Sequence, residues 1–124
     1  MKKITALLLS LLMLTGCAGE PAGYTQISQE KAAELMSTEE NYIILDVRTA
    51  GEFADGHITG AVNIPNESIG PEVSSLLPDK DQLILVYCRS GNRSKQASQK
   101  LSDLGYTQVM EFGGINTWTG SIEK

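Results

Sequence analysis

Residues 83–94, LILVYCRSGNRS, decide the fold of this 124-residue chain, because a strand, a tight loop and a helix start follow one another directly. Leu83 to Tyr87 is the most apolar strand candidate after the N-terminal region. A short run of β-forming residues is typical of a strand that is covered on both faces. After the loop 88–92, apolar residues recur on one helical face up to Leu104, which predicts a helix there.

The same alternation of strand and helix patterns extends along the chain from residue 24. Four further strands are predicted, at residues 24–27, 42–45, 61–64 and 108–110. Helices are predicted at 28–36 and 69–77, with a helical turn around 52–54 and a final short helix bearing Trp118. Alternating strands and helices predict an α/β fold: a single domain with a mostly parallel five-stranded sheet and helices on both faces.

The N-terminal region has the layout of a secretory signal. Lys2 and Lys3 precede an apolar run, Ile4 to Leu14, which falls short of the roughly 20 apolar residues that span a bilayer. Residues 14–17, LTGC, resemble the lipobox of bacterial lipoproteins, which implies lipidation of Cys17. A plain signal peptide followed by a chance cysteine is the alternative.

We therefore expect three segments: a lipoprotein signal peptide over 1–16, lipidated Cys17 with a flexible tether over 17–23, and one domain over 24–124. Such a protein is extracytoplasmic and is held at a bacterial membrane through Cys17. Removing residues 1–16 takes the formal net charge from −5 to −7. This acidity argues against a nucleic-acid partner. The chain's single histidine, His57, argues against a structural zinc site.

Lipidation of Cys17 would leave Cys88 as the one cysteine without a partner, which makes it a candidate reactive thiol. Cys88 follows a strand of the predicted sheet, where binding sites of open α/β sheets form. The loop amides and the helix start favour an anion there, and Gly91 lets the loop fold tightly. Arg89 and Arg93 add positive charge.

These features predict a Cys88 thiolate at neutral pH without a histidine base. The prediction requires that the loop amides face the sulfur and that solvent reaches it. The alternative is a buried, inert cysteine that merely follows a core strand.

Three stretches in the same order resemble the motifs of the rhodanese family. The first runs from Leu45-Asp46-Val47-Arg48 to Asn63-Ile64-Pro65, the second is the loop that begins at Cys88, and the third includes Gly113-Gly114 and Trp118. Together they extend over about residues 25–122. The resemblance implies a sulfurtransferase in which the Cys88 thiolate attacks the outer sulfur of a donor such as thiosulfate, and the persulfide passes that sulfur to cyanide or a thiol.

The resemblance also implies roles for the other motif residues. The expected partners are a small anionic sulfur donor and a thiol acceptor, small molecule or protein, with no metal and no organic cofactor. Asp46 and Arg48 are expected to form a structural ion pair or a hydrogen-bond network at a strand end, and His57 is expected to hold its loop rather than act as a base. The residues expected to bind the donor or the persulfide are Arg89, Ser90, Gly91, Asn92, Arg93 and Ser94.

Three other functions stay open. Related phosphatases and arsenate reductases have a loop one residue longer than the six residues from Cys88 to Arg93, which favours sulfur transfer here. A non-catalytic binding module would not need Cys88. A thiol-redox protein would need a resolving cysteine, which the chain lacks once Cys17 is lipidated.

Overall fold

The computed structural model describes residues 23–124. The predicted signal segment, Cys17 and all of the predicted tether except Gly23 lie outside the described residues. The helices and strands are β1 (Thr25–Gln26), α2 (Gln29–Thr38), β2 (Tyr42–Asp46), α3 (Ala50–Asp55), β3 (His57–Ile58), β4 (Val62–Asn63), η1 (Asn66–Ser68), η2 (Pro71–Ser75), β5 (Leu83–Cys88), α4 (Asn92–Asp103), β6 (Gln108–Gly114), η3 (Ile115–Thr117) and β7 (Ile122–Glu123), where η marks a 3-10 helix.

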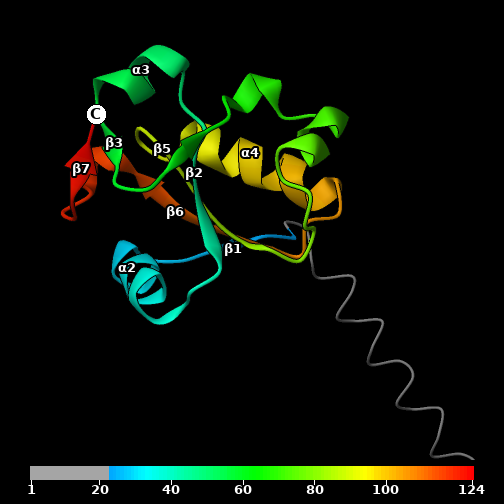
Figure 1. Ribbon diagram of the computed structural model, residues 1–124, viewed down its shortest axis with the longest axis horizontal. Helices are drawn as coiled ribbons and strands as arrows, with labels where there is room; N and C mark the ends of the chain where they lie inside the picture. The colour runs from blue at the N-terminus through cyan, green and yellow to red at the C-terminus, as the bar shows by residue number, and fades with distance from the viewer. Residues whose placement is uncertain (1–22) are drawn as a thin grey trace, which may run out of the picture.

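The main sheet has five strands in the order β1-β6-β5-β2-β4, and every neighbouring pair is parallel. The predicted α/β class, the five strands and their parallel arrangement are confirmed. Strand β5 lies at the centre, and helices α2 and α4 lie on opposite sides of the sheet (Figure 1). The carboxyl end of the central strand therefore holds Cys88, where the sequence placed the site.

Side chains of β5 alternate between two apolar cores because successive residues of a strand point to opposite faces. One core contains Ile84, Val86 and Cys88, together with α4 residues such as Leu101. The other contains Leu83, Leu85, Tyr87 and Phe112, with α2 supplying Ala32. Cys88 thus belongs to the α4 face of the sheet.

Two local predictions differ from the structure. The predicted helix over 69–77 is instead the 3-10 segment η2, which follows η1. Gly70 precedes this segment and Pro78 follows it, so the helical segment does not extend at either end. The two-stranded antiparallel sheet of β3 and β7 was not predicted, since two residues per strand carry no detectable periodicity.

The ends of the longer helices follow the sequence closely. Ser28 caps α2, as its position predicted, and its hydroxyl accepts a hydrogen bond from the Lys31 amide. Helix α4 ends before Gly105, whose φ of +100° is the left-handed conformation that favours glycine after a helix. These caps fix where the loops on either side of the sheet begin.

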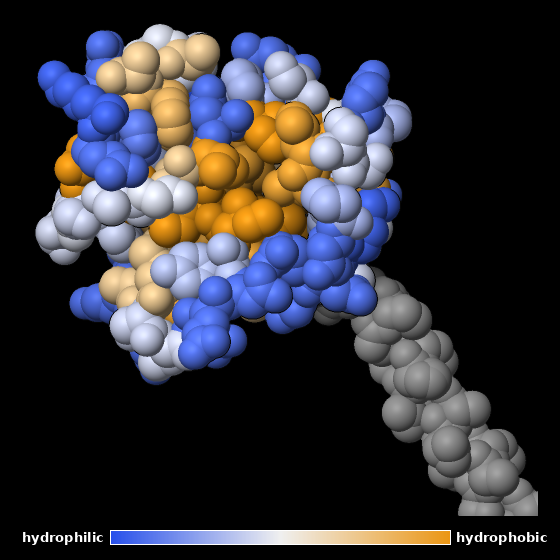
Figure 2. Space-filling view, viewed as in Figure 1, coloured by the Kyte–Doolittle hydropathy of each residue, from blue (hydrophilic) through white to orange (hydrophobic). Residues whose placement is uncertain are grey.

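Apolar side chains gather in a hollow on one face of the molecule and are framed by polar ones (Figure 2). At the β4 edge of the sheet, Ile43, Val62, Ile64, Leu76 and Leu77 line a depression, and Leu76 is 65% exposed. Within residues 23–124, no helix has the length and apolar character needed to cross a membrane.

Candidate active site

The loop between β5 and α4 wraps around the sulfur of Cys88. The Gly91 N–H donates a hydrogen bond to Sγ over 3.0 Å. Gly91 reaches this position with a φ of +114°, a left-handed conformation that residues with a Cβ rarely adopt. The loop amides therefore face the sulfur, as the sequence analysis required.

The wall opposite the loop is the end of β6, where Gly113 and Gly114 lie. A Cβ at Gly114 would overlap the backbone carbonyl of Arg89, so this position has no room for a side chain. Gly113 adopts a φ of +97°, which also favours glycine. The Asn116 N–H donates to the Arg89 carbonyl at 3.2 Å and fastens the loop to the wall. This close approach explains the paired glycines of the third motif.

Cys88 is only 1% exposed, which differs from the open thiol that the sequence interpretation required. Cys88 is the last residue of the central strand, whereas the loop residues Arg89, Ser90 and Asn92 are exposed. Burial raises the pKa of the Cys88 thiol, but hydrogen bonds from the backbone amides of Ser90, Gly91 and Ser94 lower it, and the balance places the pKa below its ordinary value. The exposed residues next to the sulfur are therefore those of the loop.

The two loop arginines have different surroundings. Arg93 forms a bidentate pair with Glu52 of α3, with nitrogen–oxygen distances of 2.8 and 3.1 Å. The hydrogen bond from Arg93 is the main reason why the pKa of Glu52 falls to about 2. Arg89 is exposed, and the ion pairs within residues 23–124 do not include it. The contact between Glu52 and Arg93 was not predicted from the sequence.

Asp46 and Arg48 form a buried ion pair at the end of β2. Arg48 Nη2 lies 2.7 Å from Asp46 Oδ2 and also donates to the Gly56 carbonyl over 2.7 Å. The Tyr87 hydroxyl donates to the same Asp46 oxygen at 2.6 Å and accepts from the Ile58 N–H at 3.0 Å. The pair therefore joins the end of β2 to the central strand and to β3, and it does not contact the sulfur.

His57 lies in the same supporting region and not beside Cys88. Its ring stacks on Phe53 with a centroid distance of 3.7 Å, and Nδ1 lies 2.8 Å from the Phe53 carbonyl oxygen. Nε2 lies 3.5 Å from a carboxylate oxygen of Glu123. These contacts hold α3, β3 and β7 together, and they place His57 among the loop-holding residues.

Ser94 and Glu111 form a polar pair beside the sulfur. The Ser94 hydroxyl oxygen lies 3.4 Å from Cys88 Sγ and donates to Glu111 Oε2 at 2.5 Å. Ser94 does not cap α4, because the N-cap is Gly91 and no side chain caps it. Glu111 was missed; its signal is an acidic residue inside the apolar strand VMEF.

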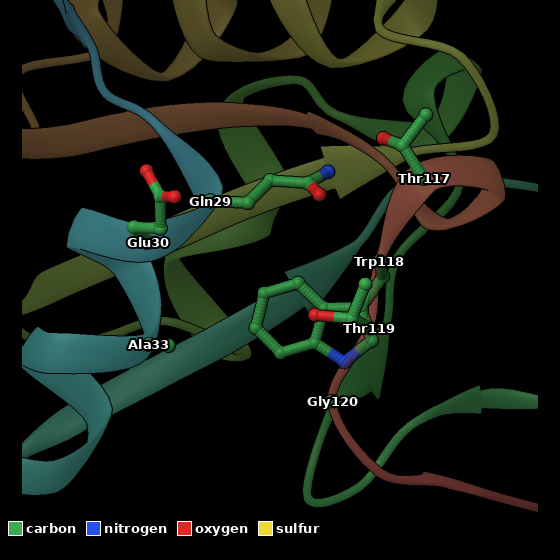
Figure 3. A pocket seen from close by; sticks show the side chains of 7 residues that line it. All are labelled: Gln29, Glu30, Ala33, Thr117, Trp118, Thr119 and Gly120. Atoms are coloured by element: carbon green, nitrogen blue, oxygen red, sulfur yellow. The ribbon is translucent and has the colours of Figure 1, made fainter.

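A separate hollow lies between α2 and the segment after η3 (Figure 3). The indole of Trp118 lies across it above Gly120, and Gln29, Glu30 and Ala33 line the α2 side. Trp118 packs on Phe112 with ring centroids 5.6 Å apart, so its role includes core packing. None of the cradle residues 88–94 lines this hollow, and no cluster of metal-ligating side chains occurs within the described part of the chain.

Two family descriptions match this chain. Residues 28–121 match the rhodanese-like domain, and residues 1–18 match the prokaryotic membrane lipoprotein lipid attachment site. The lipoprotein character and the extracytoplasmic, membrane-anchored location inferred from the sequence are thereby confirmed.

Curated relatives agree with the domain match. The thiosulfate sulfurtransferase PspE of Escherichia coli is 38% identical over 71 residues, which cover 57% of this chain and 68% of that protein. A sulfurtransferase of Allochromatium vinosum is 35% identical over 94 residues, covering 75% and 86% of the two chains.

Solved structures show the same fold. A solution structure of a rhodanese-like domain from Anabaena has a TM-score of 0.72 at 32% identity, covering 79% of this chain and 77% of that one. A structure described as rhodanese with anions from E. coli has a TM-score of 0.62 at 34% identity, covering 67% and 98%.

Proposed function

The chain belongs to the rhodanese-like domain family and is a thiosulfate sulfurtransferase-like enzyme, and from this premise we propose that Cys88 carries the transferred sulfur as a persulfide. The observation that supports this assignment is the amide cradle: the Gly91 N–H lies 3.0 Å from Sγ, and the loop from Cys88 to Arg93 has six residues. Amide donors around a sulfur stabilise a thiolate and, after loading, a persulfide anion.

The proposed reaction has two steps. The Cys88 thiolate attacks the outer sulfur of a donor such as thiosulfate; a new S–S bond forms, and the donor's S–S bond breaks with its electron pair leaving on sulfite. A thiolate or cyanide acceptor then attacks the outer sulfur of the persulfide, and the Cys88 thiolate leaves with the electron pair of that bond. Neither step requires a metal ion or an organic cofactor.

The loop residues would act on charge and position. The amides of Ser90, Gly91 and Ser94 would stabilise the negative charge on sulfur, in agreement with their lowering of the Cys88 pKa. Arg89, which is exposed and outside the ion pairs of residues 23–124, would attract the anionic donor. Arg93, held by Glu52, would contribute a fixed positive charge at the start of α4, next to exposed Asn92.

Cys17 would carry the lipid that anchors this chemistry at the membrane surface. The support is the position of Cys17 within the matched lipid attachment site, residues 1–18. The tether of residues 17–23 would hold the domain of residues 24–124 close to that surface, where donors and acceptors are extracytoplasmic.

The assignment of Cys88 is tested by assaying thiocyanate formation from thiosulfate and cyanide with the full chain. We expect Cys88→Ser to abolish the activity and Cys17→Ser to retain it, both measured on detergent-solubilised, purified protein. Unchanged activity in Cys88→Ser would contradict the assignment. Hydrolysis of an aryl phosphate by the unmodified chain, without thiocyanate formation, would indicate a phosphatase instead.

A further inference from the structure

Glu111 is a buried acidic residue that the proposed reaction does not use. It lies on β6, is 2% exposed, and faces the hollow behind the cradle that Gly91 and Lys95 also line. Burying a carboxylate is costly unless hydrogen bonds or a cation compensate for its lost hydration. The surroundings of Glu111 therefore carry information about its function.

Three donors surround the Glu111 carboxylate. Ser94 donates to Oε2 at 2.5 Å, the Gly113 N–H donates to Oε2 at 3.1 Å, and the Gln26 side chain donates to Oε1 at 3.4 Å. Among the described residues, the ion pairs include no cation bound to Glu111. A set made only of donors suits an ionised carboxylate, which is an acceptor at every lone pair.

The charged and titratable groups around Glu111 come from few elements. Strand β5 contributes Cys88, and helix α4 contributes Lys95, which is exposed and therefore screened by solvent. Strand β1 and helix α2 contribute the neutral amides of Gln26 and Gln29 to the same hollow. Cys88 is thus the buried titratable neighbour of Glu111.

The Ser94 hydroxyl lies between these two groups and has a single proton. Its oxygen is 2.5 Å from Glu111 Oε2, 3.0 Å from the Gly91 carbonyl oxygen and 3.4 Å from Cys88 Sγ. A hydrogen bond to an ionised carboxylate is the strongest of these options. Because Ser94 donates its hydrogen bond to Glu111, its oxygen presents a lone pair to the sulfur. A lone pair can accept a hydrogen bond from a protonated thiol but cannot stabilise a thiolate.

We propose that Glu111 is a positioning residue that restrains the ionisation of Cys88. It accepts the hydrogen bond of the Ser94 hydroxyl, and it places a second negative charge near the sulfur, with only that hydroxyl between them. This inference rests on the proposed function, in which Cys88 is the sulfur carrier. Two anions at this separation disfavour each other, so the Glu111 carboxylate favours the protonated form of the Cys88 thiol.

The same arrangement gives the thiol proton a route to Glu111. Cys88 transfers its proton to Ser94 while Ser94 transfers its own to the Glu111 carboxylate, which yields a thiolate and a carboxylic acid with no change in net charge. The thiolate then attacks the donor as described above, and the electron pair of the broken bond leaves on sulfite. The proton stays on Glu111 until the thiolate is regenerated.

The test is the pH profile of Cys88 alkylation by iodoacetamide in the full chain, from about pH 4 to about pH 10, quantified on the Cys88 peptide by mass spectrometry. Compared with the unmodified chain, Glu111→Gln should lower the apparent pKa of Cys88 alkylation by about one unit or more and make alkylation about tenfold faster near pH 6. Glu40→Gln, an exposed carboxylate at the opposite end of β2, should leave the profile unchanged.

Ser94→Ala separates the hydroxyl from the charge. We expect this substitution to raise the Cys88 pKa more in the Glu111→Gln background than in the unmodified chain, because only there is the hydroxyl free to donate to sulfur. A Cys88 pKa that is unchanged or higher in Glu111→Gln would overturn the proposal. Alkylation does not require sulfur transfer, so this outcome is distinct from a failure of the thiocyanate assay.

Discussion

The two sides of the cradle are the loop of residues 88–94 and the wall of residues 111–114. They have opposite effects on the negative charge of the Cys88 sulfur. The loop supplies amide donors such as the Gly91 N–H, which favour a negative charge on Cys88. The wall supplies the Glu111 carboxylate, which disfavours that charge, and Gly114, which lets the two sides meet. The loop thus favours the ionised form of Cys88. The wall opposes that ionisation through Glu111, and its glycine allows the close contact with the loop.

The largest expected effect comes from filling the contact between loop and wall. In Gly114→Ala, the new Cβ would overlap the Arg89 carbonyl, so the backbone on one side must move. We expect a loss of at least about 3 kcal/mol in the free energy of unfolding, measured by urea denaturation.

Gly51→Ala is the matched control for this change. A Cβ at Gly51, on α3, would meet nothing within 4 Å. Replacing an exposed helical glycine by alanine should raise the free energy of unfolding by about 0.5–1 kcal/mol. Equal free energies of unfolding for Gly114→Ala and Gly51→Ala would contradict the close contact between Gly114 and the Arg89 carbonyl.

The support behind the loop should be the next most sensitive feature. In Tyr87→Phe, Asp46 loses a hydrogen bond of 2.6 Å and the buried Ile58 N–H loses its acceptor. We expect the free energy of unfolding to fall by about 1–3 kcal/mol in urea denaturation. Tyr42→Phe removes a partly buried bond to the Met36 carbonyl and should cost less, about 0.5–1 kcal/mol. The reverse order would contradict the importance assigned to the Asp46 network.

Charge on the exposed side of the loop should affect binding more than stability. Arg89→Ala should raise the KM for thiosulfate by about three- to tenfold, with less change in kcat, and the difference should shrink at high salt. Lys31→Ala, on α2, is the control and should leave KM unchanged. A KM that is insensitive to Arg89 would mean that donor attraction comes from the amides and the helix start alone.

The smallest expected effect concerns the ion pair between Arg93 and Glu52. Because the Glu52 pKa is lowered from 4.5 to about 2 in the folded protein, its stabilisation is present above about pH 4.5 and is lost as pH falls toward 2. Glu52→Gln should therefore lower the free energy of unfolding by about 0.5–1 kcal/mol near pH 7, with the difference vanishing near pH 2. Glu34→Gln, which removes an exposed pair, should have a smaller effect. A difference that grows toward acid pH would contradict this account.

The sequence predicted the features that depend on local pattern. The strand before Cys88, the helix after Asn92 and the glycine at 91 all follow from spacing and from backbone requirements. The α/β sheet followed because strands and helices alternate along the chain.

Features that depend on contacts between distant residues were not predictable in this way. Glu111 meets Ser94 across 17 positions, and Arg93 meets Glu52 across 41. No spacing rule connects such residues, because the sheet order and the approach of β6 to the loop bring them together. The near-complete burial of Cys88 also depends on the sheet order, because Cys88 pairs with Gly114 of the neighbouring strand β6.

The most direct test of the central assignment is the mass of the Cys88 peptide after incubation of the full chain with thiosulfate. We expect a gain of one sulfur atom at Cys88, and the loss of that atom when cyanide is added. A Cys88 peptide that keeps its original mass while the chain forms thiocyanate would contradict the assignment, because the transferred sulfur would then be carried elsewhere.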